Sequence, residues 1–212
     1  MKVHKVDEDL TAADIFNRIP PYKLVHDWLG AETVERLLRF AQSNEHRFVD
    51  TQVTHGEEDR VDHTRRVSKK VSLGCFKNEI RGKVADLLPV MFDRLGIKPF
   101  VPSKIEVELV AHGDGAFFAR HIDTLTHSEG RRRIISAVYY FYALPKAFSG
   151  GVLRLHSPAA SGQQCTFADI APDCDTLVFF PSFFPHEVLP VKCARGHFLD
   201  SRFAINIWIR RS

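Results

Sequence analysis

Hydrophobic and polar residues follow two different periods along the chain, and the change falls near residue 100. Residues 31–43 place apolar side chains at i, i+3, i+4 and i+7, a spacing that predicts an amphipathic helix. Residues 78–95 repeat the same three- and four-residue spacing with Pro89 inside it. Because proline removes a helical hydrogen bond, a kinked or divided second helix is expected there.

After residue 100 the period becomes two, which is typical of strands. Residues 105–110 alternate strictly, and residues 22–28 do so more loosely near the start of the chain. Further β-forming runs cover residues 134–144, 151–156, 176–180 and 202–209. Short strands separated by turn residues predict a jelly-roll sandwich or barrel. The expected fold class is therefore α+β, mainly β, with the helices near the N-terminus.

Residues 50–70 are polar and poor in large hydrophobic side chains, which predicts a loop. Arg65 and Arg66 lie in this stretch. They are interpreted either as solvated charges or as lid residues that contact an acidic or peptide substrate. Residues 1–100 are accordingly expected to form a helical support and lid region, within the same domain as the β-core of residues 101–212.

Composition limits the partners and the cellular compartment that are expected. Hydrophobic residues make up 44% of the 212 residues, enough for one core. The formal charge of +3 comes with no long basic run and by itself argues neither for nor against nucleic acid, which is not among the expected partners. No stretch approaches the roughly 20 apolar residues of a membrane span, and no secretory signal opens the chain. None of the four cysteines forms a C-x-x-C pair, so reduced thiols in a cytoplasmic protein are expected rather than a zinc cluster.

The candidate chemistry lies in His121-Ile122-Asp123 and Pro185-His186. Residues i and i+2 of a strand point to the same side, so His121 and Asp123 can ligate one ion, with His186 as the third ligand. Two histidines and one carboxylate are the facial triad of non-haem Fe(II) oxygenases. His-x-Asp alone is a weak signal, since His112-Gly113-Asp114 repeats it in a glycine-flanked segment that predicts a turn. The ordered series that follows, a β-run, a Gly-Gly hairpin, a Pro-His step and a final strand opening on Arg202, is far more specific.

In these features, residues 105–210 resemble the Fe(II)/2-oxoglutarate dioxygenases, and most of all the prolyl 4-hydroxylase group. The stretches that carry the resemblance are Arg120-His121-Ile122-Asp123, Val138-Tyr139-Tyr140, Ser149-Gly150-Gly151-Val152-Leu153-Arg154, Phe179-Phe180-Pro181, Pro185-His186-Glu187-Val188 and Ser201-Arg202-Phe203-Ala204-Ile205-Asn206-Ile207-Trp208. The resemblance implies a double-stranded β-helix, a jelly-roll or cupin-like barrel with supporting N-terminal helices. It also implies that His121, Asp123 and His186 bind Fe(II).

The resemblance further implies a site for 2-oxoglutarate and O₂, with ascorbate as a candidate reductant. Arg202 is expected to hold the distal carboxylate of 2-oxoglutarate, because a guanidinium pairs with a carboxylate in bidentate fashion, and Tyr140 is expected to assist it. The remaining pocket candidates are Leu153, Asn206 and Trp208.

Two departures from the family pattern bear on this site. His186 and Arg202 are sixteen residues apart, longer than is usual. The insert of residues 192–200 is interpreted as a hairpin extension in which Lys192 or Arg195 is a rival to Arg202, although Arg202 directly precedes the matching strand. In addition, Ala111 stands near the place of a family tyrosine, so either the pocket is more open or His112 compensates.

The expected activity is hydroxylation with release of succinate and CO₂. The substrate is either a prolyl residue in a peptide or protein, or a free amino acid or natural product. Asp123 favours hydroxylation over halogenation, while desaturation and epimerisation stay open. Arg202 and Arg210 do not reproduce the arginine spacing of the relatives that repair nucleic acid. The alternative is a metal-binding cupin-like barrel without oxygenase activity, an isomerase or a sensor, which has no need for a carboxylate anchor such as Arg202.

Overall fold

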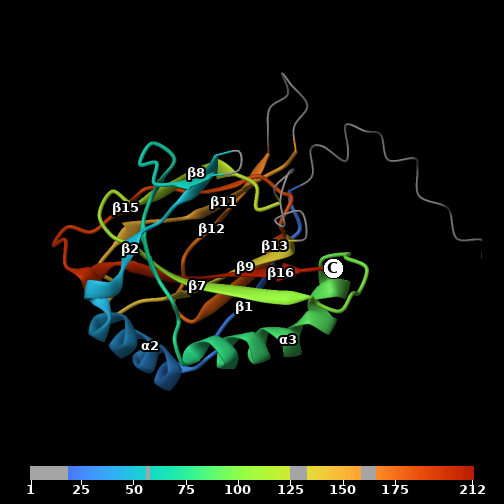
Figure 1. The fold of residues 1–212 in the computed structure, drawn as a ribbon, viewed down its shortest axis with the longest axis horizontal. Coiled ribbons are helices and arrows are strands. Elements are labelled where there is room, and N and C mark those ends of the chain that lie inside the picture. Colours follow the sequence, from blue (N-terminus) through green and yellow to red (C-terminus); the bar gives the residue numbers. More distant parts are fainter. Residues whose placement is uncertain (1–18, 56–57, 125–132, 159–165) are drawn as a thin grey trace, which may run out of the picture.

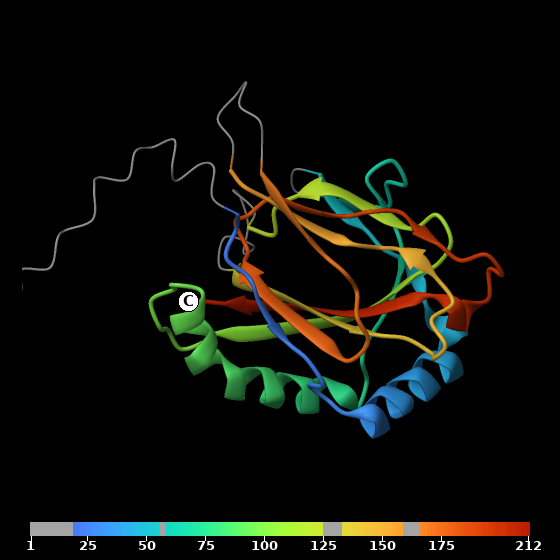
Figure 2. The ribbon, with the colours of Figure 1, turned by 180° about the vertical axis from the view of Figure 1, so that it is seen from behind.

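Two antiparallel β-sheets face each other, and two helices cover the outer face of the larger sheet (Figure 1). The structure is a computed structural model, and it describes residues 19–55, 58–124, 133–158 and 166–212. The same three layers are visible from behind (Figure 2). Facing antiparallel sheets closed in this way form a double-stranded β-helix, the fold class predicted from the strand pattern.

The larger sheet has seven strands in the order β1-β13-β9-β16-β7-β6-β2. Their bounds are Lys23–Val25 (β1), Val49–Asp50 (β2), Lys69–Val71 (β6), Lys104–His112 (β7), Arg133–Phe141 (β9), Thr176–Pro181 (β13) and Arg202–Arg210 (β16). The predicted strands near residues 22–28, 105–110, 134–144, 176–180 and 202–209 are confirmed. The central strand β16 pairs with β7 on one side and β9 on the other.

The smaller sheet has five strands in the order β12-β11-β14-β8-β5. Their bounds are Arg66–Val67 (β5), Phe117–His121 (β8), Leu153–His156 (β11), Phe167–Ile170 (β12) and His186–Val188 (β14). Two further pairs are β3 (Val53–His55) with β4 (Glu58–Arg60), and β10 (Ser149–Gly150) with β15 (Val191–Lys192). The remaining short elements are the 3-10 helices η1 (Glu45–Arg47) and η3 (Phe198–Asp200).

Both predicted helices are present, as α2 (Ala31–Ser43) and α3 (Phe76–Arg94). Pro89 lies inside α3 without dividing it, so the expectation of a split helix is wrong. The apolar stripes of both helices join one cluster with the larger sheet. Buried members from the helices include Leu37, Ala41, Ile80, Val84 and Leu88.

The two faces of strand β16 have different roles. Phe203, Ile205 and Ile207 are fully buried and belong to the cluster beneath the helices. The alternate residues point to the opposite side, where Ala204 joins a second apolar cluster between the sheets. Arg202 lies on this inner side too. One strand therefore supplies both the helix-facing core and the wall of an internal site.

The prediction of a loop over residues 50–70 is wrong for most of that stretch. It contains part of β2, all of β3 to β5 and the first two residues of β6. Strand β5 pairs with β8 in the smaller sheet, whereas β6 pairs with β7 in the larger one. Only Ser68 separates them, and it is buried. Its hydroxyl lies 2.9 Å from the Thr51 hydroxyl and accepts from Arg66 Nε at 3.1 Å.

A buried carboxylate fixes the junction between β1 and α2. Asp175 accepts hydrogen bonds from the backbone N–H groups of Leu29 and Gly30, each at 2.8 Å. It also accepts from the Tyr139 hydroxyl at 2.8 Å. The start of α2, which has no side-chain cap of its own, is thus anchored to strand β9 through one side chain.

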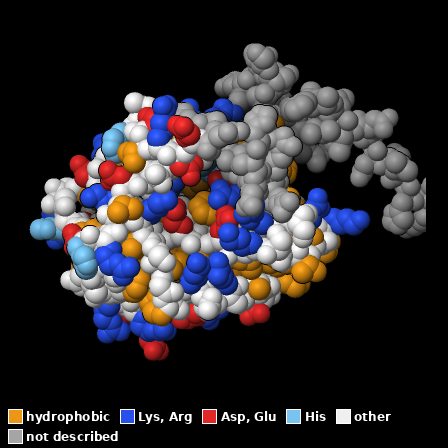
Figure 3. All heavy atoms as spheres, in the orientation of Figure 1, with side chains coloured by type: hydrophobic (Ala, Val, Ile, Leu, Met, Phe, Trp, Pro, Cys, Tyr) orange, Lys and Arg blue, Asp and Glu red, His pale blue; other side chains and the backbone are white. Residues whose placement is uncertain are grey.

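Basic and acidic side chains are interspersed over the described part of the surface seen in Figure 3. Within the described ranges, no helix has the apolar length that a membrane crossing requires.

Candidate active site

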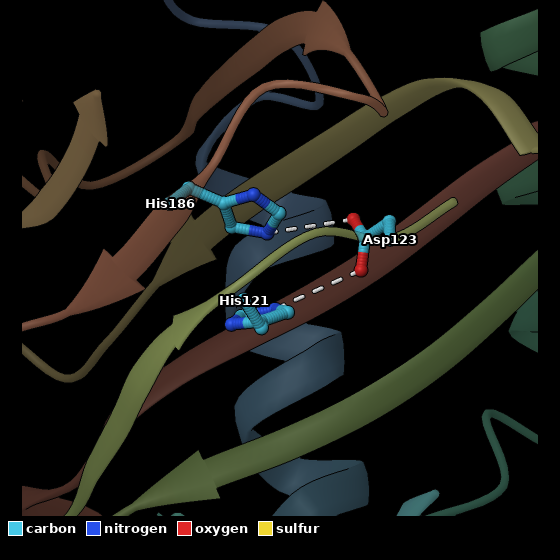
Figure 4. Close-up of side chains that lie close together, drawn as sticks. All are labelled: His121, Asp123 and His186. Carbon is cyan, nitrogen blue, oxygen red and sulfur yellow. Dashed lines mark ion pairs between the residues drawn. The ribbon is translucent and has the colours of Figure 1, made fainter. Parts of the chain in front are cut away.

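Three side chains from the smaller sheet converge on one point. His121 ends β8, Asp123 follows two residues later, and His186 begins the neighbouring strand β14, directly opposite His121. His121 Nε2 lies 3.7 Å from Asp123 Oδ1, and His186 Nε2 lies 3.5 Å from Asp123 Oδ2. Figure 4 shows both rings turned toward the carboxylate. One potential ligand atom from each residue falls within 4.8 Å of the other two, so the set can hold a single metal ion.

The hydrogen bonds of the two imidazoles select the tautomer that a metal requires. His121 Nδ1 lies 2.9 Å from the carbonyl oxygen of Ala119, and His186 Nδ1 lies 2.9 Å from that of Phe184. A carbonyl only accepts, so Nδ1 carries the proton in each ring. The lone pair of each Nε2 is then directed at the shared centre, an arrangement typical of metal-binding histidines. Burial, reinforced by His186, also lowers the pKa of His121 to about 3 and keeps the ring neutral.

Asp123 is held in its ionised form. Burial by itself would raise the pKa of this carboxyl, but His186, His121 and a hydrogen bond from Ser136 outweigh burial and lower it. The Ser136 hydroxyl, 2.6 Å from Asp123 Oδ2, is in turn 2.9 Å from the Ser182 hydroxyl. Two imidazoles and one carboxylate are the donor set that suits Fe(II) with coordination positions left open.

A small cavity of about 40 Å³ adjoins this centre. All three triad residues line it, and so do the predicted pocket residues Leu153, Arg202, Asn206 and Trp208. The volume is that of a few water molecules, so the cavity is narrow. The structure therefore brings these predicted residues together around one cavity, although they come from both sheets.

Arg202 is the unusual member of this cavity, because its guanidinium is almost fully buried and no carboxylate pairs with it among the described residues. Its Nη1 lies 3.1 Å from His112 Nδ1, while its Nε lacks a hydrogen-bond partner there. The guanidinium carbon lies 4.8 Å from the centre of the Tyr140 ring, and the Tyr140 hydroxyl is likewise without a partner. Burial raises the pKa of Tyr140 to about 12, although the nearby Arg202 opposes that shift. Two buried donors are thus left for an absent acceptor.

The Gly-Gly hairpin is shaped around the same arginine. Gly151 has φ +65°, and a Cβ placed on it would lie 2.5 Å from Arg202 Cδ and 2.9 Å from Val191 Cγ2. Only glycine combines this conformation with so close an approach. The insert of residues 192–200 does not supply a replacement: Arg195 forms a bidentate salt bridge with Asp200, and Lys192 lies outside the residues that line this cavity.

A larger cavity of about 550 Å³ opens from the triad. It shares Arg66, Phe118, His121, Asp123 and Trp208 with the small cavity, so the two cavities adjoin each other. The other residues that line it include Gln52, Val53, Asp59, Arg65, Lys70, Glu108 and Arg133. Residues of the β3–β4 hairpin thus form part of its wall.

The two arginines proposed for a lid differ in position. Arg65 is exposed and lines the larger cavity. Arg66 is buried on β5, with its guanidinium 4.6 Å from the centre of the Phe118 ring and 3.7 Å from Glu108. The Phe118 ring is itself stacked on His121 at 3.5 Å. Arg66 therefore forms part of the fixed wall between the cavities.

Two residues of this site, Ser136 and Phe118, were not singled out from the sequence. Ser136 was included only in a predicted β-run. His112 was considered only as a substitute for a missing family tyrosine. The sequence feature that pointed to His112 was its position nine residues before His121. Its pairing with Arg202, however, depends on strand register.

Comparisons with known proteins agree with this geometry. The sequence model of the 2OG-Fe(II) oxygenase superfamily matches residues 107–210. An uncharacterized PKHD-type hydroxylase of Synechocystis sp. is 39% identical over 136 residues, which are 62% of this chain and 45% of the relative. The match thus spans less than half of that relative's length.

Solved structures share the fold. A prolyl-4-hydroxylase of Pseudomonas putida gives a TM-score of 0.64 at 23% identity, covering 91% of this chain and 94% of the other. A Trichoplax adhaerens prolyl hydroxylase, solved with a peptide of hypoxia inducible factor, gives 0.63 at 19% identity over 90% and 84%. The epimerase SnoN of nogalamycin biosynthesis gives 0.55 at 12% identity over 90% and 78%. At these identities the likeness concerns the fold alone. The sequence match covers residues 107–210, which include the triad and Arg202, so this chain is similar to the 2OG-Fe(II) oxygenase superfamily, with a likeness to its prolyl 4-hydroxylases.

Proposed function

We propose that this protein is a hydroxylase that uses Fe(II), 2-oxoglutarate and O₂, and that His121, Asp123 and His186 hold the iron. When bound, the iron with its two co-substrates supplies the oxidising chemistry that inserts oxygen into a C–H bond and releases succinate and CO₂. The protein residues bind the metal, orient the co-substrate and restrict access of water.

The observation that carries this proposal is the buried guanidinium of Arg202 without a carboxylate partner among the described residues. A buried cation is costly unless it is paired. A dicarboxylate ligand meets this need, because its distal carboxylate accepts from Arg202 and from the Tyr140 hydroxyl. A metal-binding barrel without a co-substrate has no use for such an anchor, which disfavours the alternative of an isomerase or sensor.

The larger cavity is the proposed substrate site. Its volume of about 550 Å³ suits a prolyl residue with its neighbours in a peptide, or a free amino acid or natural product. Leu153 and Asn206 line the small cavity beside the triad, and Trp208 lines both cavities. The Synechocystis relative, which is 39% identical over the matched residues, is named as a hydroxylase, and this name supports hydroxylation.

The test is the conversion of 2-oxoglutarate to succinate by the protein with added Fe(II) under air, with and without proline-containing peptides and free amino acids. Hydroxylated product should appear together with succinate. No succinate with any substrate, together with no anaerobic binding of 2-oxoglutarate, would overturn the proposal.

A pair of histidine variants tests the triad. His186→Ala should abolish both iron retention and turnover, because it removes one of three ligands. His63→Ala is the matched control, since His63 is exposed and lines neither cavity. If His186→Ala retains iron as well as His63→Ala does, His186 is not a ligand.

A further inference from the structure

His112 and Arg202 are brought together by strand register. They occupy directly opposite positions on the antiparallel strands β7 and β16, where side chains on the same face are close neighbours. His112 is only 2% exposed, and both residues line the small cavity beside the triad. The contact of 3.1 Å between Arg202 Nη1 and His112 Nδ1 is therefore built into the sheet.

The chemistry of the pair dictates where the protons lie. Arginine only donates hydrogen bonds, so His112 Nδ1 must accept with its lone pair, and the ring proton resides on Nε2. Burial lowers the pKa of His112 well below its usual value, and the charges of Arg202 and Arg66 lower it further. The imidazole is consequently neutral and able to accept from the arginine.

The same contact decides which edge of the guanidinium is available. Nη1 is engaged by His112, whereas Nε has no partner among the described residues. The edge that faces away from Nη1 consists of Nε and Nη2, which are parallel donors suited to both oxygens of one carboxylate. The unpartnered Tyr140 hydroxyl is a third donor for the same anion.

We propose that His112 is a positioning residue for the co-substrate: its neutral imidazole holds Nη1 of Arg202 so that the Nε–Nη2 edge faces the distal carboxylate. This inference rests on the proposed function, in which Arg202 binds that carboxylate. In this chain a histidine on β7 thereby orients the anchor from the neighbouring strand, without contact with the reacting atoms.

The test compares two ligands and two variants by calorimetric titration of the Mn(II)-loaded protein. 2-Oxoglutarate is compared with 2-oxopentanoate, which carries a methyl group in place of the distal carboxylate. His112→Leu removes the acceptor, whereas His112→Asn keeps one near the position of Nδ1. We expect His112→Leu to weaken 2-oxoglutarate binding by about tenfold to a hundredfold, the usual effect of losing a hydrogen bond to a charged group. Binding of 2-oxopentanoate should change little.

Each outcome has a distinct meaning. His112→Asn should bind 2-oxoglutarate more tightly than His112→Leu; equal weakening of both ligands, or no weakening in either variant, would overturn the positioning role. If His112→Leu does not fold, the ligand comparison in His112→Asn and the ¹⁵N NMR signals of the wild-type ring decide. A proton found on Nδ1 refutes the inference directly. Wild-type protein that binds 2-oxoglutarate no better than 2-oxopentanoate would instead refute the role of Arg202, and with it the proposed function.

Discussion

Replacing Gly151 by alanine is a direct probe of how the hairpin shapes the anchor for the co-substrate. The new Cβ would lie 2.5 Å from Arg202 Cδ, whereas carbon atoms in contact are about 3.5–4.0 Å apart. The side chain of Arg202 must therefore retreat by about 1 Å or the hairpin must move. Either response changes the position of the guanidinium in the small cavity.

The energetic cost has two separable parts. A residue with a Cβ at a left-handed φ costs about 1–2 kcal/mol, and forcing extra atoms into a packed site costs about 1–3 kcal/mol more. Gly196 offers a matched control, because its φ of +66° is nearly that of Gly151 and nothing lies within 4 Å of its potential Cβ. Gly196→Ala should show only the backbone cost.

Thermal unfolding measures the loss of stability, and titration with 2-oxoglutarate measures whether the guanidinium has moved. For a domain of this size 1 kcal/mol shifts the melting temperature by about 2–4 °C. Gly151→Ala should thus melt roughly 2–12 °C below Gly196→Ala. A misplacement of about 1 Å can cost about a hundredfold in a positioned site, so we expect a large loss of 2-oxoglutarate affinity in Gly151→Ala and none in Gly196→Ala.

The reasoning is refuted if both variants melt alike and bind 2-oxoglutarate as the wild type does. That result would mean that the hairpin yields without disturbing Arg202. A variant that loses stability but keeps its affinity would separate the packing role of Gly151 from the positioning of the guanidinium.

Three other predictions concern residues that contact the site and residues that stabilise the fold. Ser136→Ala removes the 2.6 Å hydrogen bond to Asp123 and should weaken Fe(II) binding about 10–100-fold in a metal titration. In the metal-free protein the pKa values of His121, about 3, and of His112 lie below that of an unfolded histidine. Below about pH 6.5 the unfolded chain therefore binds more protons than the folded protein does. The free energy of unfolding should fall as the pH is lowered from 7 to 5, by up to ~1.4 kcal/mol per pH unit for each ring. Denaturant titrations at several pH values measure this change. Asp175→Ala leaves three buried donors without an acceptor and should lower the free energy of unfolding by about 2–5 kcal/mol.

Matched variants show whether these effects are local. Ser157→Ala removes a buried hydroxyl that accepts from the backbone of Thr166, and it should leave Fe(II) affinity unchanged. Asp169→Ala breaks an exposed pair with Arg154 and should cost at most about 1 kcal/mol. Equal losses for either pair of variants, or stability that is flat between pH 7 and 5, would contradict the corresponding argument.

The predictable parts of the fold are the helices and strands in which burial imposes a regular spacing of apolar residues. Helix α2 has the predicted bounds because one stripe faces the larger sheet. The inner strands β9, β13 and β16 are apolar on both faces or alternate strongly, since each lies between two neighbours. The polar strands of residues 50–70 carry no such signal: β2 and β4 are exposed at every position, so the hydrophobic pattern could not distinguish them from a loop.

Candidate site residues could be predicted where residue types and their order along the chain indicate a chemistry. Contacts that depend on strand register could not be predicted. His121, Asp123 and His186 were predicted as ligands from their types and order, and the structure brings the three together. Asp123 lies just beyond the end of β8, so a conformation other than the strand assumed in the prediction places it beside His121. The pairing of His112 with Arg202 joins residues that lie ninety positions apart, and no short-range pattern encodes which residue of β7 faces which residue of β16.

The single-residue step at Ser68 has a mechanical consequence. The chain leaves the smaller sheet at Val67 and enters the larger one at Lys69. One extended residue spans at most about 3.3–3.6 Å, so the two layers cannot spread at this edge without breaking a ladder. The molecule should therefore be stiff here, and any widening that admits a bulky substrate must come from the side of the β3–β4 hairpin, whose two strands pair only with each other.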